Sequence, residues 1–202
     1  MDTKLIVGNN VYHHIYNRGA HKADIFLDGS DYVRMLKLLY IANNDEPFVL
    51  SRLPDNVFDL PKKHILVDII TYCLMPNHIH IALKNMAPEL PGIDDNVTKF
   101  MHKLTTGYSA YFNKKYRHSG TIWQGTYKEK TVYDGLYIKT LIDYIHLNPR
   151  VLRDNNANIN EDTPEKLEFA MNYEYSSIKD YAGIARLQSS ILNACEISRF
   201  RA

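Results

Sequence analysis

The chain has 202 residues, of which 45% are hydrophobic, so it is long enough to enclose one substantial core. Its formal net charge is +1, so overall charge gives no argument for or against a polyanionic partner. No apolar run reaches the length of a transmembrane helix, Met1–Asn10 lacks the pattern of a secretory signal, and the two cysteines lie far apart. We therefore expect no membrane association, no disulfide, no cysteine zinc site and a reducing cytoplasmic location.

The first third of the chain predicts a strand, a helix and a loop. β-Branched and aromatic residues predict a strand over Val11–Asn17. Apolar residues at helical spacing predict a helix over Asp28–Asn43, with Asp28 or Ser30 as its N-cap. The three prolines of Asn44–Lys63 predict a loop, with a short strand at most over Phe48–Leu50.

A hairpin is predicted next. Ile65–Leu74 is rich in β-branched residues, and we expect Ile65, Val67, Ile69 and Thr71 to share one face. Met75-Pro76-Asn77 predicts a turn, and His78–Leu83 predicts the returning strand.

The second half alternates between helices and a strand. The sequence predicts helices over Asn96–Tyr116 and from Asp134 to Leu147, the latter ended by Asn148-Pro149, and a strand over Gly125–Val132 between them. A polar loop over Asp154–Thr163, a short helix over Pro164–Asn172 and a helical tail beyond Gly183 follow.

The order strand–helix–strand–strand–helix–strand is that of the ferredoxin-like split βαβ arrangement. We therefore predict an α+β fold with an antiparallel sheet, helices on one face of that sheet, and a C-terminal helical extension.

His78 and His80 carry the first candidate chemistry. Residues i and i+2 of a strand point to one face, so the two imidazoles can chelate one divalent ion while Ile79 points into the core. His13 and His14, as neighbours, face opposite ways and do not chelate. Two histidines leave a metal site incomplete, and the alternative is a structural or surface role for the pair.

The predicted helix from Asp134 carries the second set of candidate catalytic residues. Tyr137, Leu141, Tyr144 and Asn148 recur at spacings of four, three and four, which places them on one face. The Tyr144 phenol can attack phosphorus while the Asn148 amide oxygen reaches the same metal. Taken alone, this helix favours the alternative, in which its tyrosines pack against the sheet and Asn148 is a C-cap.

The window Lys99–Lys130 combines seven Lys or Arg with one acid and seven aromatic residues, as a single-strand binding surface requires. A solvated helix face with ordinary core aromatics is the alternative. The cations we assign to DNA phosphates are Arg18, Lys103, Lys114, Lys115, Arg117, Lys128 and Lys130, and the rings that we assign to base stacking are Trp123 and Tyr127.

Three strings together resemble the HUH single-tyrosine transposases, and most closely their REP-associated tyrosine transposase branch. The strings are Tyr-Cys-Leu-Met-Pro-Asn-His-Ile-His-Ile (72–81), Ile-Trp-Gln-Gly-Thr-Tyr-Lys (122–128) and Tyr-Ile-His-Leu-Asn-Pro (144–149). The resemblance spans roughly 12–183. It is weakest over 44–63, which looks longer than the usual link, and at Ala20-His21-Lys22.

The resemblance implies a catalytic domain over 8–153 and a helical extension over 154–202. It implies that His78 and His80 bind Mg²⁺ or Mn²⁺, and that Tyr144 cleaves and rejoins DNA through a 5′-phosphotyrosine. Asn148 stands where relatives outside this branch have a glutamine ligand, so it is the implied third ligand, although its side chain is one methylene shorter. The implied partner is single-stranded or hairpin DNA, bound by a monomer or homodimer. Alternatives are a silent, domesticated hairpin-binding protein, a metal phosphoesterase that uses water, and an RNA-binding ferredoxin-like domain.

Overall fold

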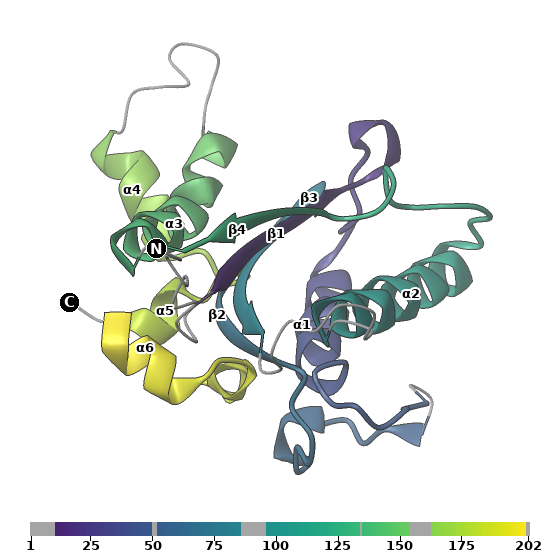
Figure 1. Cartoon of the computed structure of the whole chain (residues 1–202). Coiled ribbons are helices and arrows are strands. Elements are labelled where there is room, and N and C mark those ends of the chain that lie inside the picture. The colour runs from purple at the N-terminus through teal and green to yellow at the C-terminus, as the bar shows by residue number, and fades with distance from the viewer. Residues whose placement is uncertain (1–10, 50–51, 86–95, 134, 154–162, 201–202) are drawn as a thin grey trace, which may run out of the picture.

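The structure is a computed structural model that describes residues 11–49, 52–85, 96–133, 135–153 and 163–200. Its centre is a four-stranded antiparallel sheet with the order β2-β3-β1-β4 (Figure 1). The strands are β1 (Tyr12–Arg18), β2 (Val67–Met75), β3 (His78–Asn85) and β4 (Lys128–Val132). The predicted α+β class, the antiparallel sheet and the ferredoxin-like strand order are confirmed.

Two helices cover one face of the sheet, as predicted. These are α1 (Gly29–Ile41), whose N-cap is Asp28, and α2 (Asn96–Tyr116). Their apolar sides meet Ile15, Ile79 and other inward residues in one buried cluster. The hydrophobic effect of this cluster fixes the orientation of β1 and β3, and therefore which of their residues face the other way.

The third helix corrects our expectation of helices on one face, because α3 (Gly135–Leu147) lies on the opposite side of the sheet (Figure 1). The physical reason is that β2 is buried along its whole length. Its outward residues Ile70, Cys73 and Met75 need apolar cover, and Ile138, Ile142 and other residues of α3 supply it in a second cluster.

An irregularity in β2 corrects another expectation. Thr71 does not share a face with Ile69, because the register of the β2–β3 pair shifts between them. Ile69 belongs to the α1–α2 cluster, whereas Thr71 bonds to His146 of α3. A bulge of this kind inserts one residue and turns the following side chains to the other face.

The link over 44–63 contains a 3₁₀ turn (Val57–Asp59). Residues 48 and 49 form no strand, and residue 50 lies outside the described residues. The predicted cap Asp134 and most of the predicted loop 154–163 also lie outside them. In the part of the chain that is described, no helix has the length and apolarity to cross a membrane.

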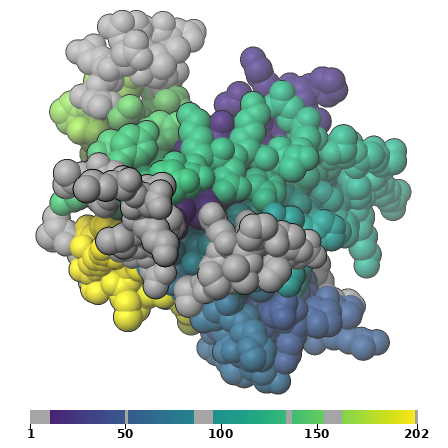
Figure 2. Space-filling view, viewed as in Figure 1, coloured from purple at the N-terminus to yellow at the C-terminus, as the bar shows by residue number. Residues whose placement is uncertain are grey.

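The C-terminal region is helical, as predicted, and packs on the sheet. Its elements are η4 (Asn148–Arg153), α4 (Pro164–Met171), α5 (Ile178–Tyr181), η5 (Leu187–Ile191) and α6 (Ala194–Phe200). Ser176 forms a β-bridge with Cys73 at the edge of β2, and Tyr12 donates a hydrogen bond to Glu196 at 3.1 Å. In the space-filling view, α6 (yellow) lies against the body of the molecule (Figure 2).

Candidate nuclease site

His78 and His80 open β3, and both face the side of the sheet that α3 covers. Their ring centroids are 5.0 Å apart and the rings are edge to face. Ile79 between them is fully buried in the opposite core. The strand alternation therefore brings the two imidazoles together as the sequence predicted.

Both rings are neutral near pH 7. Burial, together with the nearby Arg18 charge, lowers the pKa of His78 to about 4. Burial, together with the neighbouring His78, His14 and Arg18, lowers the pKa of His80 to about 3. A neutral imidazole keeps one nitrogen lone pair, which is what a metal ion binds.

One ring nitrogen of each histidine is already engaged inside the protein. His78 Nδ1 lies 2.6 Å from the side-chain oxygen of Asn77. His80 Nδ1 lies 3.0 Å from Nε2 of His14. His13 points to the other face, where its Nδ1 lies 2.6 Å from Glu129 Oε1, so the predicted opposition of His13 and His14 is observed.

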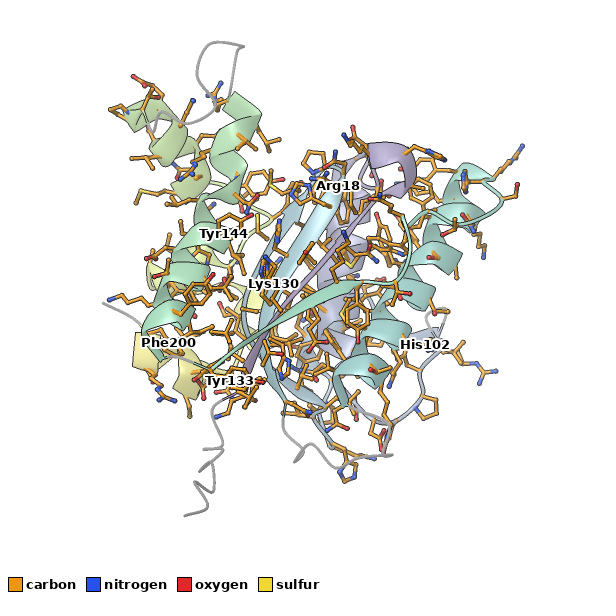
Figure 3. The ribbon with its side chains drawn as sticks, turned by 45° about the horizontal axis from the view of Figure 1, so that its top comes forward. Arg18, His102, Lys130, Tyr133, Tyr144 and Phe200 are labelled. Atoms are coloured by element: carbon orange, nitrogen blue, oxygen red, sulfur yellow. The ribbon has the colours of Figure 1, made fainter. Side chains whose placement is uncertain are left out.

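Tyr144 reaches the same place from α3. Its ring centroid is 5.8 Å from that of His80 and 6.1 Å from that of His14, and both contacts are edge to face. Its side chain is half exposed. Figure 3 shows Tyr144 on α3, with Arg18 and Lys130 on the neighbouring sheet.

Asn148 follows one turn later, where α3 passes into η4. Its amide nitrogen donates a hydrogen bond to the Tyr144 carbonyl oxygen at 3.3 Å. A hydrogen bond between the Asn148 side chain and His78 raises the pKa of that histidine. The proposed third ligand therefore lies beside the histidine pair.

These groups line one cleft of about 670 Å³ between α3 and the sheet. The sequence predicted six of its lining residues: Arg18, His78, His80, Lys128, Tyr144 and Asn148. It missed Tyr16, Asn17, Gln124, Gly125, Thr126 and Val151. For Tyr16 a signal existed in the sequence, because it lies two residues before Arg18 at the end of the predicted strand and therefore on the same face.

The donor set fits a divalent ion, with two neutral imidazoles and one amide oxygen beside an exposed phenol. The described residues contain no group of three or more His, Cys, Asp or Glu arranged to hold a metal ion. Among the described residues, the two imidazoles and one amide oxygen would leave the coordination of such an ion incomplete, and a substrate oxygen would have to complete it.

The predicted DNA contacts divide into cations that are exposed on the surface and residues that are engaged in contacts within the protein. Arg18, Lys128 and Lys130 are exposed on or beside the cleft, and Lys114 and Arg117 are exposed at the end of α2. These five cations are available to a phosphate backbone.

Four other predicted contacts are engaged inside the protein. Lys115 donates to Asp28 and Asp31, and Lys103 donates to the carbonyl oxygens of Asn44 and Glu46. We therefore assign a structural role to both lysines, and the same holds for Trp123 and Tyr127.

The indole of Trp123 is only 6% exposed, and its nitrogen donates to Ser109 Oγ at 3.1 Å, so stacking on a base is corrected to a core role. Tyr127 packs partly buried against the same core, and its hydroxyl lies 3.3 Å from Thr98 Oγ1.

Comparison with known proteins finds similarity in the segment that carries these residues and in the fold. The family model described as "Transposase IS200 like" matches residues 53–148, a segment that includes His78, His80, Tyr144 and Asn148. No curated protein matches the sequence. A solved structure described as "Structure of the REP associates tyrosine transposase bound to a REP hairpin" shares the fold. Its TM-score is 0.55 at 13% identity, and the alignment covers 93% of this chain and 89% of that chain.

The matched segment resembles the transposases of the IS200-like family, and the fold over most of the chain is the one found in a REP-associated tyrosine transposase. The sequence similarity to the IS200-like transposases lies over 53–148, the segment that carries both histidines of the pair and Tyr144. The family match supports the predicted resemblance to the single-tyrosine transposases over this segment, and the fold agrees with that of the REP-associated tyrosine transposase over most of the chain.

Proposed function

We propose that this protein is a metal-dependent enzyme that nicks and rejoins single-stranded DNA next to a hairpin, with Tyr144 as its nucleophile. The observation that carries the proposal is the convergence of Tyr144 and His80, with ring centroids 5.8 Å apart, in the cleft that His78 and Asn148 also line.

Tyr144 supplies a nucleophile whose adduct conserves the energy of the phosphodiester. Its phenolic oxygen forms a bond to the scissile phosphorus and loses its proton, while the bond from phosphorus to the 3′ oxygen breaks. The 3′ oxygen gains a proton and leaves as a free hydroxyl. The reverse attack by a 3′ hydroxyl joins the strand again, so no nucleotide cofactor is required.

His78, His80 and Asn148 would hold the divalent ion, Mg²⁺ or Mn²⁺. When bound, such an ion withdraws charge from the phosphate oxygens and eases attack on phosphorus. The protein's own contribution is to keep both imidazoles neutral and aimed at one cleft, and to present Tyr144 from the opposite wall.

The exposed cations would hold the DNA. Arg18 and Lys128 line the cleft, and Lys130 lies two residues further along β4 on the same face. The structurally similar REP-associated transposase is described as bound to a REP hairpin, which supports a hairpin as the first substrate to test.

One gel assay tests the proposal. A hairpin oligonucleotide with single-stranded flanks, labelled at its 5′ or 3′ end, is incubated with the protein and Mn²⁺ and separated under denaturing conditions. We expect the 3′-labelled fragment to stay covalently on the protein and the 5′-labelled fragment to leave with a 3′ hydroxyl. Tyr144→Phe should abolish both products.

Tyr137→Phe is the matched control, because Tyr137 is also an exposed tyrosine of α3 but does not line the cleft. An adduct that survives Tyr144→Phe and disappears in Tyr137→Phe contradicts the nucleophile assignment. Cleavage without an adduct supports a phosphoesterase instead. Hairpin binding with neither product supports a DNA-binding protein without catalysis.

A further inference from the structure

A third histidine, His14 of β1, lies behind the proposed metal pair. It is 9% exposed and does not line the cleft. Its ring lies against that of His80 with centroids 5.2 Å apart and 24° between the planes. The register explains the contact, because His80 pairs with Tyr16 and His14 is the diagonal neighbour on the same face.

The bond between His14 Nε2 and His80 Nδ1, at 3.0 Å, holds a single proton. If His80 donates it, the Nε2 atom of neutral His80 carries a lone pair. If His14 donates it, neutral His80 carries its own proton on Nε2 and cannot bind a metal through that atom. The direction of this one hydrogen bond therefore decides whether His80 is a ligand.

His78 shows the arrangement that a ligand requires. Its Nδ1 lies 2.6 Å from the Asn77 side-chain oxygen, which is an acceptor, so His78 donates from Nδ1 and keeps the lone pair on Nε2. For the two imidazoles to bind one ion through equivalent nitrogens, His80 must also donate from Nδ1. The only partner at that nitrogen in the described structure is His14.

We propose that His14 is a positioning residue that accepts the Nδ1 proton of His80 and so fixes the Nε2 lone pair of His80 toward the cleft. Metal-binding histidines usually donate a hydrogen bond from their second ring nitrogen to a carboxylate, a carbonyl or water. In this protein the acceptor would be the imidazole of His14. The inference rests on the proposed function, since it gives the histidine pair its role as ligands.

The first test needs neither metal nor DNA. Nitrogen-15 NMR of the metal-free protein at neutral pH distinguishes protonated from unprotonated ring nitrogens. We expect His80 to carry its proton on Nδ1 and His14 on Nδ1, which leaves His14 Nε2 as the acceptor. A wild-type His80 protonated on Nε2 overturns the proposal, whatever the variants do.

The second test is Mn²⁺ affinity, followed by the loss of the free-ion signal in electron paramagnetic resonance. His14→Phe keeps a ring but removes the acceptor, and we expect roughly 10–100-fold weaker binding. His14→Gln offers a side-chain oxygen to the same proton and should recover part of the loss. His13→Gln is the matched control, because His13 is a buried neighbour on the opposite face.

These results separate the inference from the proposed function. A protein with the expected tautomer and Mn²⁺ affinity that leaves every hairpin uncut would retain the role of His14 and contradict the nicking activity. His14→Phe that binds Mn²⁺ as tightly as the wild type, or a wild type that binds no Mn²⁺, contradicts the role of His14 in metal binding.

Discussion

Asp31, near the start of α1, is a fully buried carboxylate. It accepts hydrogen bonds from the backbone of Leu27 and from the side chains of Lys115, Tyr111 and Tyr116. Burial raises the pKa of Asp31, but the bonds from Lys115 and Tyr116 outweigh it and leave the pKa below its usual value. The charged form is therefore the stable one, and it ties α1 to the end of α2.

We predict that Asp31→Asn lowers the free energy of unfolding by about 1–3 kcal/mol at pH 7, because a buried amide cannot accept the hydrogen bonds of Lys115, Tyr111 and Tyr116 as the carboxylate does. A depressed carboxyl pKa stabilises the fold above the unfolded value of about 4, and the benefit disappears as pH falls through the folded pKa. The difference between variant and wild type should therefore shrink at pH 3. Urea titrations at both pH values measure it, and an unchanged difference would contradict the charge argument.

Gly19 directly follows β1, next to the cleft residue Arg18. A Cβ there would lie 2.1 Å from the Ala23 carbonyl oxygen and 2.9 Å from Ile25 Cγ2. Since the Ala23 atom is backbone, the loop must move, and we predict that Gly19→Ala costs about 1–3 kcal/mol in thermal or urea unfolding. Gly125→Ala is the control, because its Cβ meets nothing within 4 Å, and it should change stability by less than about 0.5 kcal/mol.

Lys114 and Lys115 are adjacent, and the sequence assigned both to DNA. We predict that the two lysines have different roles, one in DNA binding and the other in stability. Lys114→Ala should leave stability unchanged and lower the salt dependence of hairpin binding by roughly one phosphate contact. Lys115→Ala should lower stability by about 1–3 kcal/mol, because Asp31 stays buried without its cation. Fluorescence anisotropy against salt and urea titrations give the two readouts; equal salt slopes for both variants would contradict the division.

The same residues show what a charge pattern cannot predict. The run of lysines identified a basic region, and Lys128 and Lys130 are accessible within it. Nothing local to Lys115 indicates that Asp31, 84 positions earlier, lies 2.7 Å from its amino group. Contacts between distant segments depend on how two helices pack, and residue type alone does not encode that.

At the scale of elements, periodicity predicted the strands of the sheet and the two helices, α1 and α2, that cover its first face. It failed where one residue changed the phase of a strand, since the bulge between Ile69 and Thr71 turns Thr71 to the other face. It also failed for the side that α3 covers. A strand that is apolar on both faces, such as β2, requires a packing layer on each face. The alternation of residues along the strand does not predict which helix forms the second layer.

A buried polar triangle anchors α3 behind its tyrosine. His146 Nε2 lies 2.8 Å from Thr71 Oγ1 and 2.9 Å from Ser177 Oγ, and the two hydroxyls are 2.8 Å apart. Ser177 Oγ also accepts the backbone N–H of Tyr72. Burial, and secondarily the charge of Arg186, lowers the pKa of His146 to about 3, so its ring is neutral in this triangle.

We predict that Ser177→Ala costs about 1–3 kcal/mol, because it leaves the Tyr72 N–H and part of His146 buried without partners. Hydrogen exchange along α3 should accelerate, and the yield of the Tyr144 adduct should fall as the helix loses its anchor. Ser198→Ala, at an exposed serine of α6, is the control. Unchanged exchange in α3 would show that the apolar contacts of the helix suffice to hold it.

At the scale of the whole molecule, one chain brings the proposed site together. Tyr144 arrives on α3 from beyond β4, and the histidines arrive on β3, yet their rings meet within a single copy. The buried triangle and the apolar face of α3 hold the helix against its own sheet. An arrangement in which partners exchange α3 would have to break both.

We therefore predict that catalysis does not need residues from two copies. Mixing Tyr144→Phe with the double variant His78→Ala/His80→Ala should give no adduct above that of either protein alone, because neither chain holds both groups. If α3 is exchanged in a dimer, every heterodimer of the two variants would contain one intact site, and adduct would reappear in the denaturing gel once the two proteins have exchanged subunits. Sedimentation of the mixture at the assay concentration tells whether dimers are present. Dimers without complementation support a site built within each chain, and restored adduct places Tyr144 opposite the partner's histidines.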